Sequence, residues 1–184
     1  MKKSQVDHLL RAARDITGED KFVIVGSQSL HGKGIEVDAL LASIETDLYV
    51  PNNERKTELL NAIGEGSQFH ETYGYYADPV DERTAILPRK WKQRLINLPP
   101  GDTNGAKGLC LEPHDMAVSK YIAGRDKDLH LLEALVSTGL LDKDTLLKRL
   151  DDTSTDEARK SAARARINRH FAGAQIAKQK PPKQ

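Results

Sequence analysis

Two acidic residues, Glu45 and Asp47, stand two positions apart in the alternating apolar and polar stretch 44–50. The alternation predicts a strand, and on a strand residues two apart project from the same face, so both carboxylates lie together. Two like charges at this distance repel each other unless a cation lies between them. Mg²⁺, which prefers hard oxygen ligands and often binds together with phosphates, would balance both charges. Two solvated acids on an exposed strand face are the alternative interpretation.

A second candidate is the pair Gly26 and Ser27, which directly follows the short apolar run 22–25. A glycine lets the backbone approach a ligand closely, and a helix that begins after it presents free N–H groups to a phosphate. An ordinary turn at the end of a strand explains the same two residues. The pair is neither a dinucleotide-binding fingerprint nor a P-loop.

Helical and strand-like patterns alternate along the chain and would position these residues. Apolar residues at the spacing of one helix face predict the first helix, at 4–16. We expect further helices at 37–42, 54–63, 113–123, from 126 onward, 143–150 and 155–171, and strands at 22–25, 44–50 and 108–111. The aromatic-rich residues 69–77 and the run 84–87 indicate an antiparallel pair connected by 78–83, and 91–98 indicates an extended edge segment.

This order of elements predicts an α/β (α+β) fold: a small mixed β-sheet with flanking helices, followed by a helical C-terminal region. We expect a sheet domain at 1–111 and a helical region at 112–151 that completes the site. The last segment, 152–184, should hold a basic helix and a disordered end from residue 178, where two prolines follow each other.

Composition limits the classes of protein that this chain can represent. Its 184 residues are 38% hydrophobic and 30% charged, with a mean hydropathy of -0.58, which is typical of a globular chain. The apolar runs are too short to span a bilayer, and the start of the chain does not resemble a signal peptide. The single cysteine, Cys110, excludes an internal disulfide. We therefore expect a cytoplasmic protein without a membrane partner.

The charge is distributed unevenly. Residues 155–184 carry eight Lys and Arg against two Asp and Glu, whereas the whole chain carries 28 against 27. A basic end on an acidic body attracts nucleic acid, in a way that depends on salt and not on base sequence. A solvated surface helix is the alternative explanation of the same charges.

Taken together, the turn and the acidic strand resemble the signature of the nucleotidyltransferase superfamily. That signature is a Gly-Ser turn after a strand, as at Gly26-Ser27, followed by an acid-x-acid strand, as at Glu45-Thr-Asp47. The resemblance implies that Gly26 and Ser27 hold the triphosphate of an NTP. It also implies that Glu45 and Asp47 bind Mg²⁺ and act as catalytic residues.

A downstream block is similar to the second half of the abortive-infection type nucleotidyltransferase toxins, in which a helix with a lysine precedes an Arg-x-Lys-Asp helix start. The resemblance implies that Lys120 is catalytic, that Arg125 and Lys127 face the phosphates or the base, and that Asp128 orients a basic partner. Cations at the C-terminal end of a helix also interact favourably with the helix dipole, without any ligand. Residues 74–94 resemble an uncharacterised nucleotidyltransferase-like family of bacterial proteins.

Three features depart from the superfamily pattern, one of which is a longer segment between Ser27 and Glu45 than the superfamily leads us to expect. The first metal acid is Glu45, where the superfamily typically has Asp. The third carboxylate, which activates the attacking hydroxyl, has no clear match; Asp78 and Asp81 are the nearest candidates, and both are expected in a loop. Loss of that base would leave nucleotide binding intact and remove turnover.

The resemblance, together with the acidic strand, implies a Mg²⁺-dependent nucleotidyltransferase that moves a nucleotidyl group from an NTP to a hydroxyl of RNA or protein. One alternative is a catalytically degenerate nucleotide-binding module of a toxin–antitoxin or defence system, whose partner is a cognate antitoxin or regulatory protein. Another is a nucleic-acid-binding protein that acts through its basic C-terminal helix.

Overall fold

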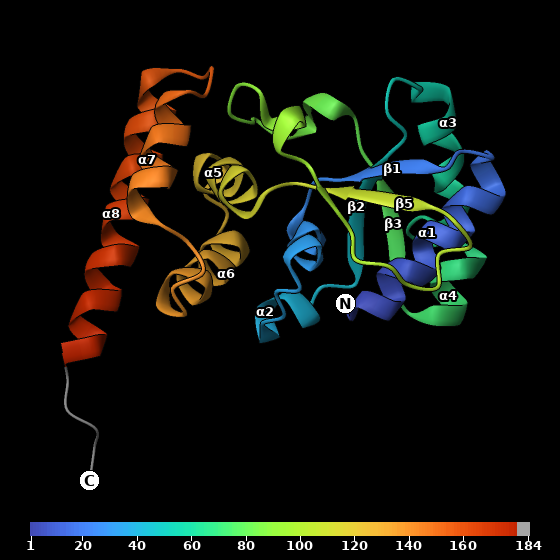
Figure 1. Cartoon of the computed structure of the whole chain (residues 1–184), viewed down its shortest axis with the longest axis horizontal. Helices are drawn as coiled ribbons and strands as arrows, with labels where there is room; N and C mark the ends of the chain where they lie inside the picture. Colours follow the sequence, from blue (N-terminus) through green and yellow to red (C-terminus); the bar gives the residue numbers. More distant parts are fainter. Residues whose placement is uncertain (180–184) are drawn as a thin grey trace, which may run out of the picture. The chain divides into compact units, whose positions relative to one another are not determined.

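The computed structural model describes residues 1–179 and consists of two compact units (Figure 1). The sheet unit comprises residues 1–85 and 91–113. The helical unit comprises residues 86–90 and the chain from 114 onward. The expected disordered end lies outside the described residues, except for residues 178 and 179, which belong to the last helix.

The sheet unit, whose residues are all described, contains five strands, four α-helices and four 3₁₀ helices. Its strands are β1 (Lys21–Ile24), β2 (Glu45–Tyr49), β3 (Tyr76–Pro79), β4 (Ile96–Asn97) and β5 (Lys107–Cys110). Its α-helices are α1 (Lys3–Thr17), α2 (Asp38–Leu41), α3 (Glu54–Glu58) and α4 (Gln68–Tyr73). The 3₁₀ helices are η1 (Ser27–Lys33), η2 (Leu59–Ile63), η3 (Glu82–Thr84) and η4 (Trp91–Arg94).

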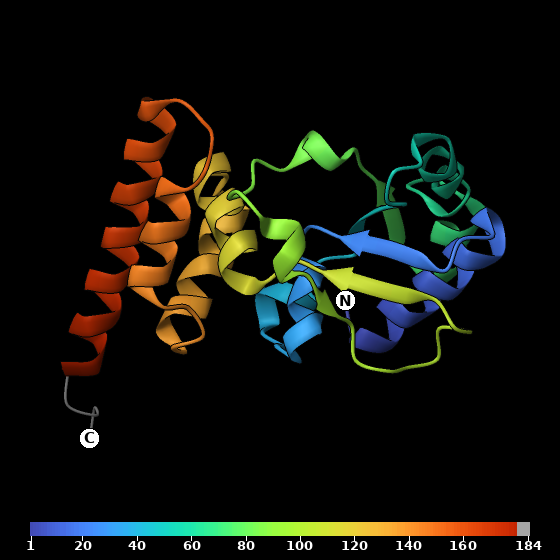
Figure 2. The same cartoon turned by 45° about the horizontal axis from the view of Figure 1, so that its top comes forward.

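The five strands form one mixed sheet in the order β3-β2-β1-β5-β4. The central strand β1 pairs in parallel with β5, which lies beside it in Figure 2, and antiparallel with β2. The edge strand β3 pairs in parallel with β2, and β4 pairs antiparallel with β5. The expected fold class, a small mixed sheet with flanking helices and a helical C-terminal region, is confirmed.

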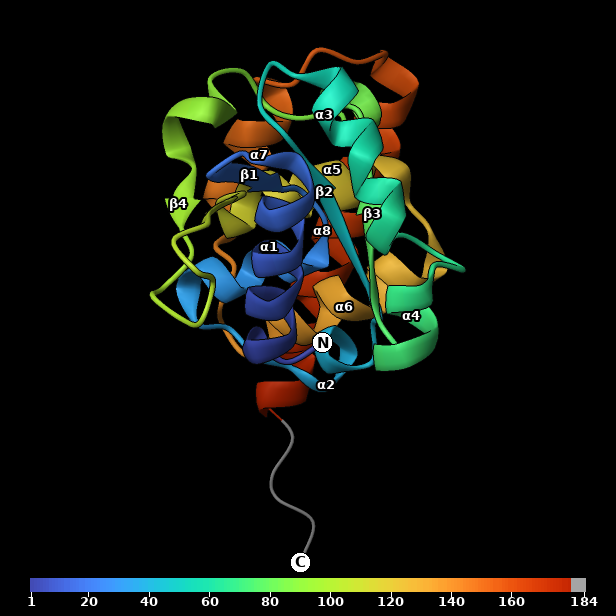
Figure 3. The ribbon, with the colours of Figure 1, turned by 90° about the vertical axis from the view of Figure 1, so that its right-hand side faces the viewer.

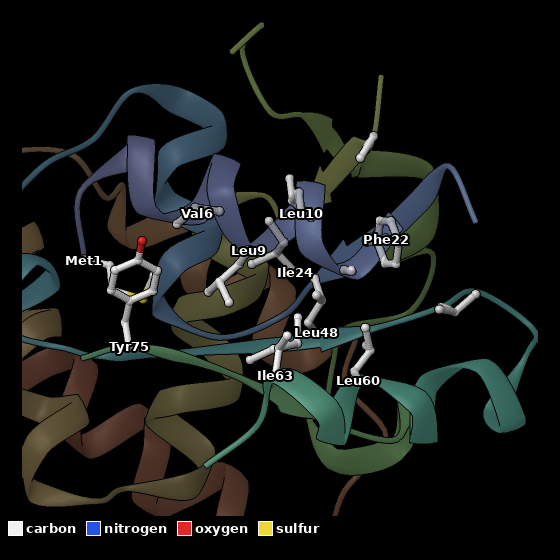
Figure 4. Close-up of a cluster of buried hydrophobic side chains, with 14 of the residues drawn as sticks. Met1, Val6, Leu9, Leu10, Phe22, Ile24, Leu48, Leu60, Ile63 and Tyr75 are labelled. Carbon is white, nitrogen blue, oxygen red and sulfur yellow. The ribbon is translucent and has the colours of Figure 1, made fainter. Parts of the chain in front are cut away.

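The core of the sheet unit lies between α1 and one face of the sheet (Figure 4). The apolar stripe of α1 is fully buried, as its spacing predicted, and it packs against strand residues such as Ile24 and Leu48. Leu60 and Ile63 of η2 complete this cluster. Since strand residues alternate between faces, the burial of Thr46 and Leu48 turns the acidic residues of β2 to the opposite face.

The prediction of a strand at 69–77 is wrong for its first half, which forms α4. Ser67 caps this helix, because its hydroxyl oxygen accepts a hydrogen bond from the His70 N–H at 3.2 Å, and Gly74 ends it at a φ of +75°. Phe69 and Tyr73 are one helical turn apart, and both rings contact His8 of α1. The helix thus brings Phe69 and Tyr73 together on one face, as a strand would also have done.

The expected antiparallel partner at 84–87 is also absent from the described sheet. Residues 82–84 form η3, and β3 pairs instead with β2. Residues 91–98 hold η4 and the two-residue strand β4 in place of one extended segment. The aromatic pattern indicated a strand near residue 76. Its pairing partner, β2, is distant in the sequence, so the local pattern does not reveal how this strand pairs.

The helical unit contains α5 (Pro113–Ala123), α6 (Asp126–Ser137), α7 (Lys143–Asp151) and α8 (Glu157–Gln179). Figure 1 shows α7 and α8 side by side. Ala163 and Ile167 of α8 are fully buried within this unit, so the basic helix packs onto its neighbours despite having few large apolar residues. Residues 86–90 join the unit through a backbone bridge between Pro88 and Thr153.

No helix within residues 1–179 combines the length and the apolar character needed to cross a membrane.

Candidate functional site

Three carboxylates project from one face of the sheet unit. Glu45 and Asp47 lie two residues apart on β2, and Asp78 of β3 is the direct register partner of Asp47. Partners in register on neighbouring strands project from the same face, and such strands lie about 4.8 Å apart. All three residues are half-buried. The sheet therefore gathers three acids where the sequence pattern indicated two.

Asp78 is the carboxylate that the sequence analysis expected in a connecting loop, and this expectation is wrong. It lies within β3, two residues after Tyr76, which is the register partner of Glu45. The other candidate, Asp81, is exposed and caps η3, where its carboxylate accepts two hydrogen bonds from the Arg83 side chain at 2.9 and 3.0 Å. The hydrogen bonds from Arg83 lower the pKa of Asp81 to about 2. Asp81 therefore pairs with Arg83 and does not lie in the sheet.

Tyr76 lies beside the acidic residues, a position that the strand predicted at 69–77 did not reveal. It is the register partner of Glu45, and its hydroxyl donates a hydrogen bond to Glu45 Oε2 at 3.3 Å. Burial, followed by the negative charge of Glu45, raises the pKa of Tyr76 to about 12. The hydroxyl therefore stays protonated at neutral pH and orients the carboxylate. Only the pairing of β2 with β3, which the sequence pattern does not reveal, connects these two residues.

Gly26 lies directly against the carboxylate of Asp47. A Cβ at position 26 would stand 1.6 Å from Asp47 Oδ2, and the φ of Gly26 is -81°, which any residue adopts. The glycine is thus required for space and not for backbone conformation. The neighbouring Val25 N–H donates to the Asp47 carbonyl oxygen at 3.2 Å. The structure therefore brings the Gly-Ser turn and the acidic strand into contact.

The segment after Gly26 forms the 3₁₀ helix η1, which begins at Ser27. The Ser29 N–H donates to the Gly26 carbonyl oxygen at 3.1 Å. Gln28 and Ser29 are buried, yet Gln28 Oε1 and Ser29 Oγ have no hydrogen-bond partner among the described residues. Such atoms are uncommon in folded proteins. Unused hydrogen-bonding capacity is therefore concentrated in the turn that follows Gly26.

The basic residues predicted from the downstream block lie in the helical unit. Asp128, at the start of α6, is 3% exposed and pairs with the Lys120 ammonium of α5 and with Arg125 Nε at 2.7 Å. Burial raises the pKa of Asp128, but the hydrogen bonds and charges of Lys120 and Arg125 outweigh it and lower the pKa overall. Lys127 is exposed. Asp128 thus holds two of the three basic side chains at the junction of α5 and α6.

Several basic residues of α8 make contacts inside the helical unit. Arg164 pairs with Asp151 at 2.6 Å, and an Arg166 guanidinium N–H donates to the Tyr121 carbonyl oxygen at 2.9 Å. Lys160 donates to the Asp151 carbonyl oxygen at 3.3 Å. Part of the positive charge of this helix therefore serves packing and capping within the unit, and a nucleic-acid surface on α8 stays a prediction.

Hard oxygen donors dominate the acidic face, and this donor chemistry suits Mg²⁺. Across residues 1–179, no group of three or more His, Cys, Asp and Glu side chains is arranged to hold a metal ion by itself. Mg²⁺ commonly takes only one or two protein carboxylates and obtains its remaining ligands from substrate phosphates and water. Glu45 and Asp47 fit this second mode of binding.

The mixed sheet combines an acid-x-acid strand, a contacting Gly-Ser turn and a third acid on the next strand, an arrangement that suits the nucleotidyltransferase class. The chain belongs to the family described as a nucleotidyltransferase of unknown function (DUF6036), whose family model matches residues 4–176. No curated protein and no solved structure shows a significant match to the chain. The similarity to abortive-infection type toxins stays a prediction.

Proposed function

We propose that the protein transfers a nucleotidyl group from an NTP to a hydroxyl of RNA or of a protein, with Mg²⁺ as its cofactor. The observation that carries this proposal is the shared face of Glu45, Asp47 and Asp78 on two neighbouring strands. Carboxylates gathered on one face provide the hard oxygen ligands that Mg²⁺ prefers. The family description supports the same class of reaction.

Glu45 and Asp47 would hold the metal ion. When bound, Mg²⁺ supplies charge neutralisation at the phosphate oxygens of the nucleotide. Tyr76 restrains the Glu45 carboxylate through its hydrogen bond, and the bare backbone of Gly26 leaves room for the Asp47 carboxylate. Ser27, at the start of η1, would contact the triphosphate together with Gly26. Most of the catalytic effect then comes from positioning and electrostatics.

Asp78 would act as the general base. It would accept the proton of the acceptor hydroxyl, whose oxygen then forms a bond to the α-phosphorus. The bond between the α-phosphorus and the bridging oxygen breaks, and pyrophosphate leaves with that electron pair. Nucleotidyl transfer of this kind requires little covalent chemistry from the protein.

The test is transfer of label from each α-labelled NTP in the presence of Mg²⁺ and total bacterial RNA and protein. The purified chain is compared with Asp47→Ala and with Asp15→Asn, which removes an exposed carboxylate from α1. We expect label in RNA or protein with the unmodified chain and with Asp15→Asn, and none with Asp47→Ala. Equal labelling by all three proteins would contradict the assignment of the site.

A second candidate function follows from the same site without turnover. A nucleotide-binding module of a toxin–antitoxin or defence system, with an antitoxin or regulatory protein as partner, would bind NTP and release it unchanged. The position of Asp78 in the sheet removes the observation that favoured this alternative, namely the missing third acid. NTP binding by a preparation that gives no labelled product with any acceptor would favour it again.

A third candidate is nucleic-acid binding through α8. It predicts RNA or DNA binding that weakens steeply as the salt concentration rises and that is lost when residues 155–184 are deleted. This activity is compatible with nucleotide transfer, because the helix would deliver the acceptor.

A further inference from the structure

A cavity of about 800 Å³ opens in the sheet unit at the carboxyl ends of β2 and β3. It is lined by the chain that follows each of these strands and by the neighbouring helix α3, which Figure 3 shows beside β2. Two residues of its wall, Tyr49 and Val80, directly continue the strands that carry the acidic residues. Its volume is within the range of ligand-binding clefts.

The cavity lies on the same face of the sheet as the three carboxylates. Tyr49 stands two residues after Asp47 on β2. Val80 stands two residues after Asp78, and its N–H donates to the Leu48 carbonyl oxygen at 3.1 Å, so the pairing of the two strands extends to this residue. Residues two apart on a strand share a face and are separated by about 7 Å. The cavity therefore begins directly beyond Asp47 and Asp78.

The Gly-Ser turn lies at the opposite end of β2. Strand β1 runs antiparallel to β2, with Ile24 as the register partner of Leu48. The Val25 N–H donates to the Asp47 carbonyl oxygen at 3.2 Å, so the pairing continues toward the start of β2. Gly26 follows and contacts the Asp47 carboxylate from that side. Along β2, the turn, the acidic residues and the cavity thus succeed one another.

This order limits where an acceptor can approach. In nucleotidyl transfer the attacking oxygen and the leaving pyrophosphate lie roughly in line, on opposite sides of the α-phosphorus. In the proposed function the triphosphate lies at Gly26 and Ser27, near the start of β2, and Asp47 holds the metal ion. The acceptor hydroxyl must then arrive from the end of β2, on the side of Asp78. The cavity is on that side.

The charge of the cavity wall disfavours RNA as the acceptor. Arg83 is the single cationic residue among the described residues that line the wall; it binds Asp81, and its charge also interacts with Glu54. The four carboxylates of the wall outnumber it and come from Glu54, Glu58, Asp81 and Glu82. The net charge of the wall is therefore negative, and it repels the phosphates of an RNA strand.

The rest of the wall suits a segment of polypeptide. Val50, Pro79 and Val80 supply hydrocarbon surface on which a side chain can pack. Side-chain amides can both donate hydrogen bonds to a peptide backbone and accept them from it. The wall contains three: Asn52, Asn53 and Asn61. Apolar surface with a few polar groups is the usual lining of a cleft that binds an organic group.

We propose that this cavity receives a segment of an acceptor protein, and that the nucleotidyl group passes to a side-chain hydroxyl of that segment and not to RNA. The side-chain oxygen forms the bond to the α-phosphorus, its proton passes to Asp78, and pyrophosphate leaves with the electron pair of the broken bond. Neighbouring residues of the acceptor pack on Val50 and Val80. This inference rests on the proposed function and narrows its acceptor.

The experiment separates the two acceptor classes. The full chain is incubated with α-labelled NTP and Mg²⁺, once with total bacterial protein freed of nucleic acid and once with total bacterial RNA freed of protein. Label is counted in products other than the chain itself. Equilibrium NTP binding is measured with the same preparations, and Asp47→Ala gives the background.

Two cavity variants fill the proposed acceptor site. Asn61→Trp and Glu58→Trp each place an indole at an exposed position of the wall, and the second serves where the first does not fold. The matched control is Thr72→Trp, at an exposed position of α4 that does not line the cavity. A circular dichroism melt of each variant verifies that it is folded.

We expect label in protein and none above background in RNA. The cavity variants should lower protein labelling at least tenfold and change NTP affinity less than threefold, whereas Thr72→Trp should change labelling less than twofold. Label in RNA that is lost in Asp47→Ala would overturn this inference and leave the proposed function standing. Unchanged labelling in a folded cavity variant, or an equal loss of NTP affinity, would also overturn it. Absence of label from both pools would overturn the proposed function together with this inference.

Discussion

Asp47 of β2 and Asp78 of β3 lie side by side as register partners in two parallel strands. The two residues are far apart in the sequence, and their side chains share the sheet face that also carries Glu45. In the proposed function, this relationship places Asp78 where the third acid would stand. It also determines which substitutions should separate nucleotide binding from nucleotide transfer.

Asp78→Asn should lower the rate of nucleotide transfer by about 100-fold or more and leave NTP affinity within about threefold of the unmodified chain. A general base typically contributes about 10² to 10⁴ to a rate, and the amide cannot accept the proton. Single-turnover labelling and equilibrium NTP binding, measured with the same preparations, separate the two effects. Asp15→Asn serves as the control. An unchanged rate in Asp78→Asn would remove Asp78 from the mechanism.

Gly26→Ala should abolish transfer, because its Cβ would occupy the position of Asp47 Oδ2 and displace the carboxylate. Overpacking of this kind costs about 2 kcal/mol in the free energy of unfolding. Gly66→Ala is the matched control: Gly66 has a φ of +73° and no neighbouring atom within 4 Å of the added Cβ. It should cost about 1 kcal/mol through backbone strain and retain transfer. Urea denaturation and the labelling assay distinguish the two variants.

Asp128→Asn should destabilise the helical unit by about 3 kcal/mol at pH 7, because it leaves the Lys120 ammonium, 12% exposed, without its counter-charge. The pKa of Asp128 is lowered in the folded state, so its contribution is complete above its unfolded pKa of about 3.9. That contribution is lost as the pH falls through the folded pKa. Urea denaturation between pH 7 and pH 3 should therefore show the difference between the two proteins shrinking below about pH 4.

The neighbouring substitution Asp126→Asn is the control for this experiment. Asp126 is exposed in the first turn of α6, where a carboxylate contributes less than about 1 kcal/mol through the helix dipole. A pH-independent difference between Asp128→Asn and the unmodified chain would show that the ion pair is not the source of the stability.

Ile167→Ala should destabilise the helical unit by about 3 kcal/mol, because Ile167 is fully buried where α8 packs on its neighbours. Ile176→Ala removes the same atoms from a position of α8 that is 59% exposed, and it should change the free energy of unfolding by less than about 0.5 kcal/mol. Thermal and urea denaturation of both variants give the comparison. Equal effects would show that α8 does not dock through Ile167.

Most helices and the central strands were predictable from local patterns. The stripe of α1 at Val6, Leu9, Leu10 and Ala13 follows the helical repeat and is buried as predicted. The strand that carries Glu45 and Asp47 also follows from its alternation. At residues 69–73 the local pattern was misleading, since aromatic residues suit both a strand and a helix face. The cap at Ser67 and the contact with His8 favour the helix.

By itself, the sequence determined the local chemistry: the acid pair of one strand face, the Gly-Ser turn after an apolar strand, and the basic composition of the last helix. These features depend on spacing within a few residues, which the period of a helix or strand translates directly into a shared face. The tertiary structure alone decided that β3 pairs with β2, that Asp78 therefore stands beside Asp47, and that Tyr76 holds Glu45. Pairing between strands is a long-range choice governed by burial of the whole sheet, so no local pattern contains it.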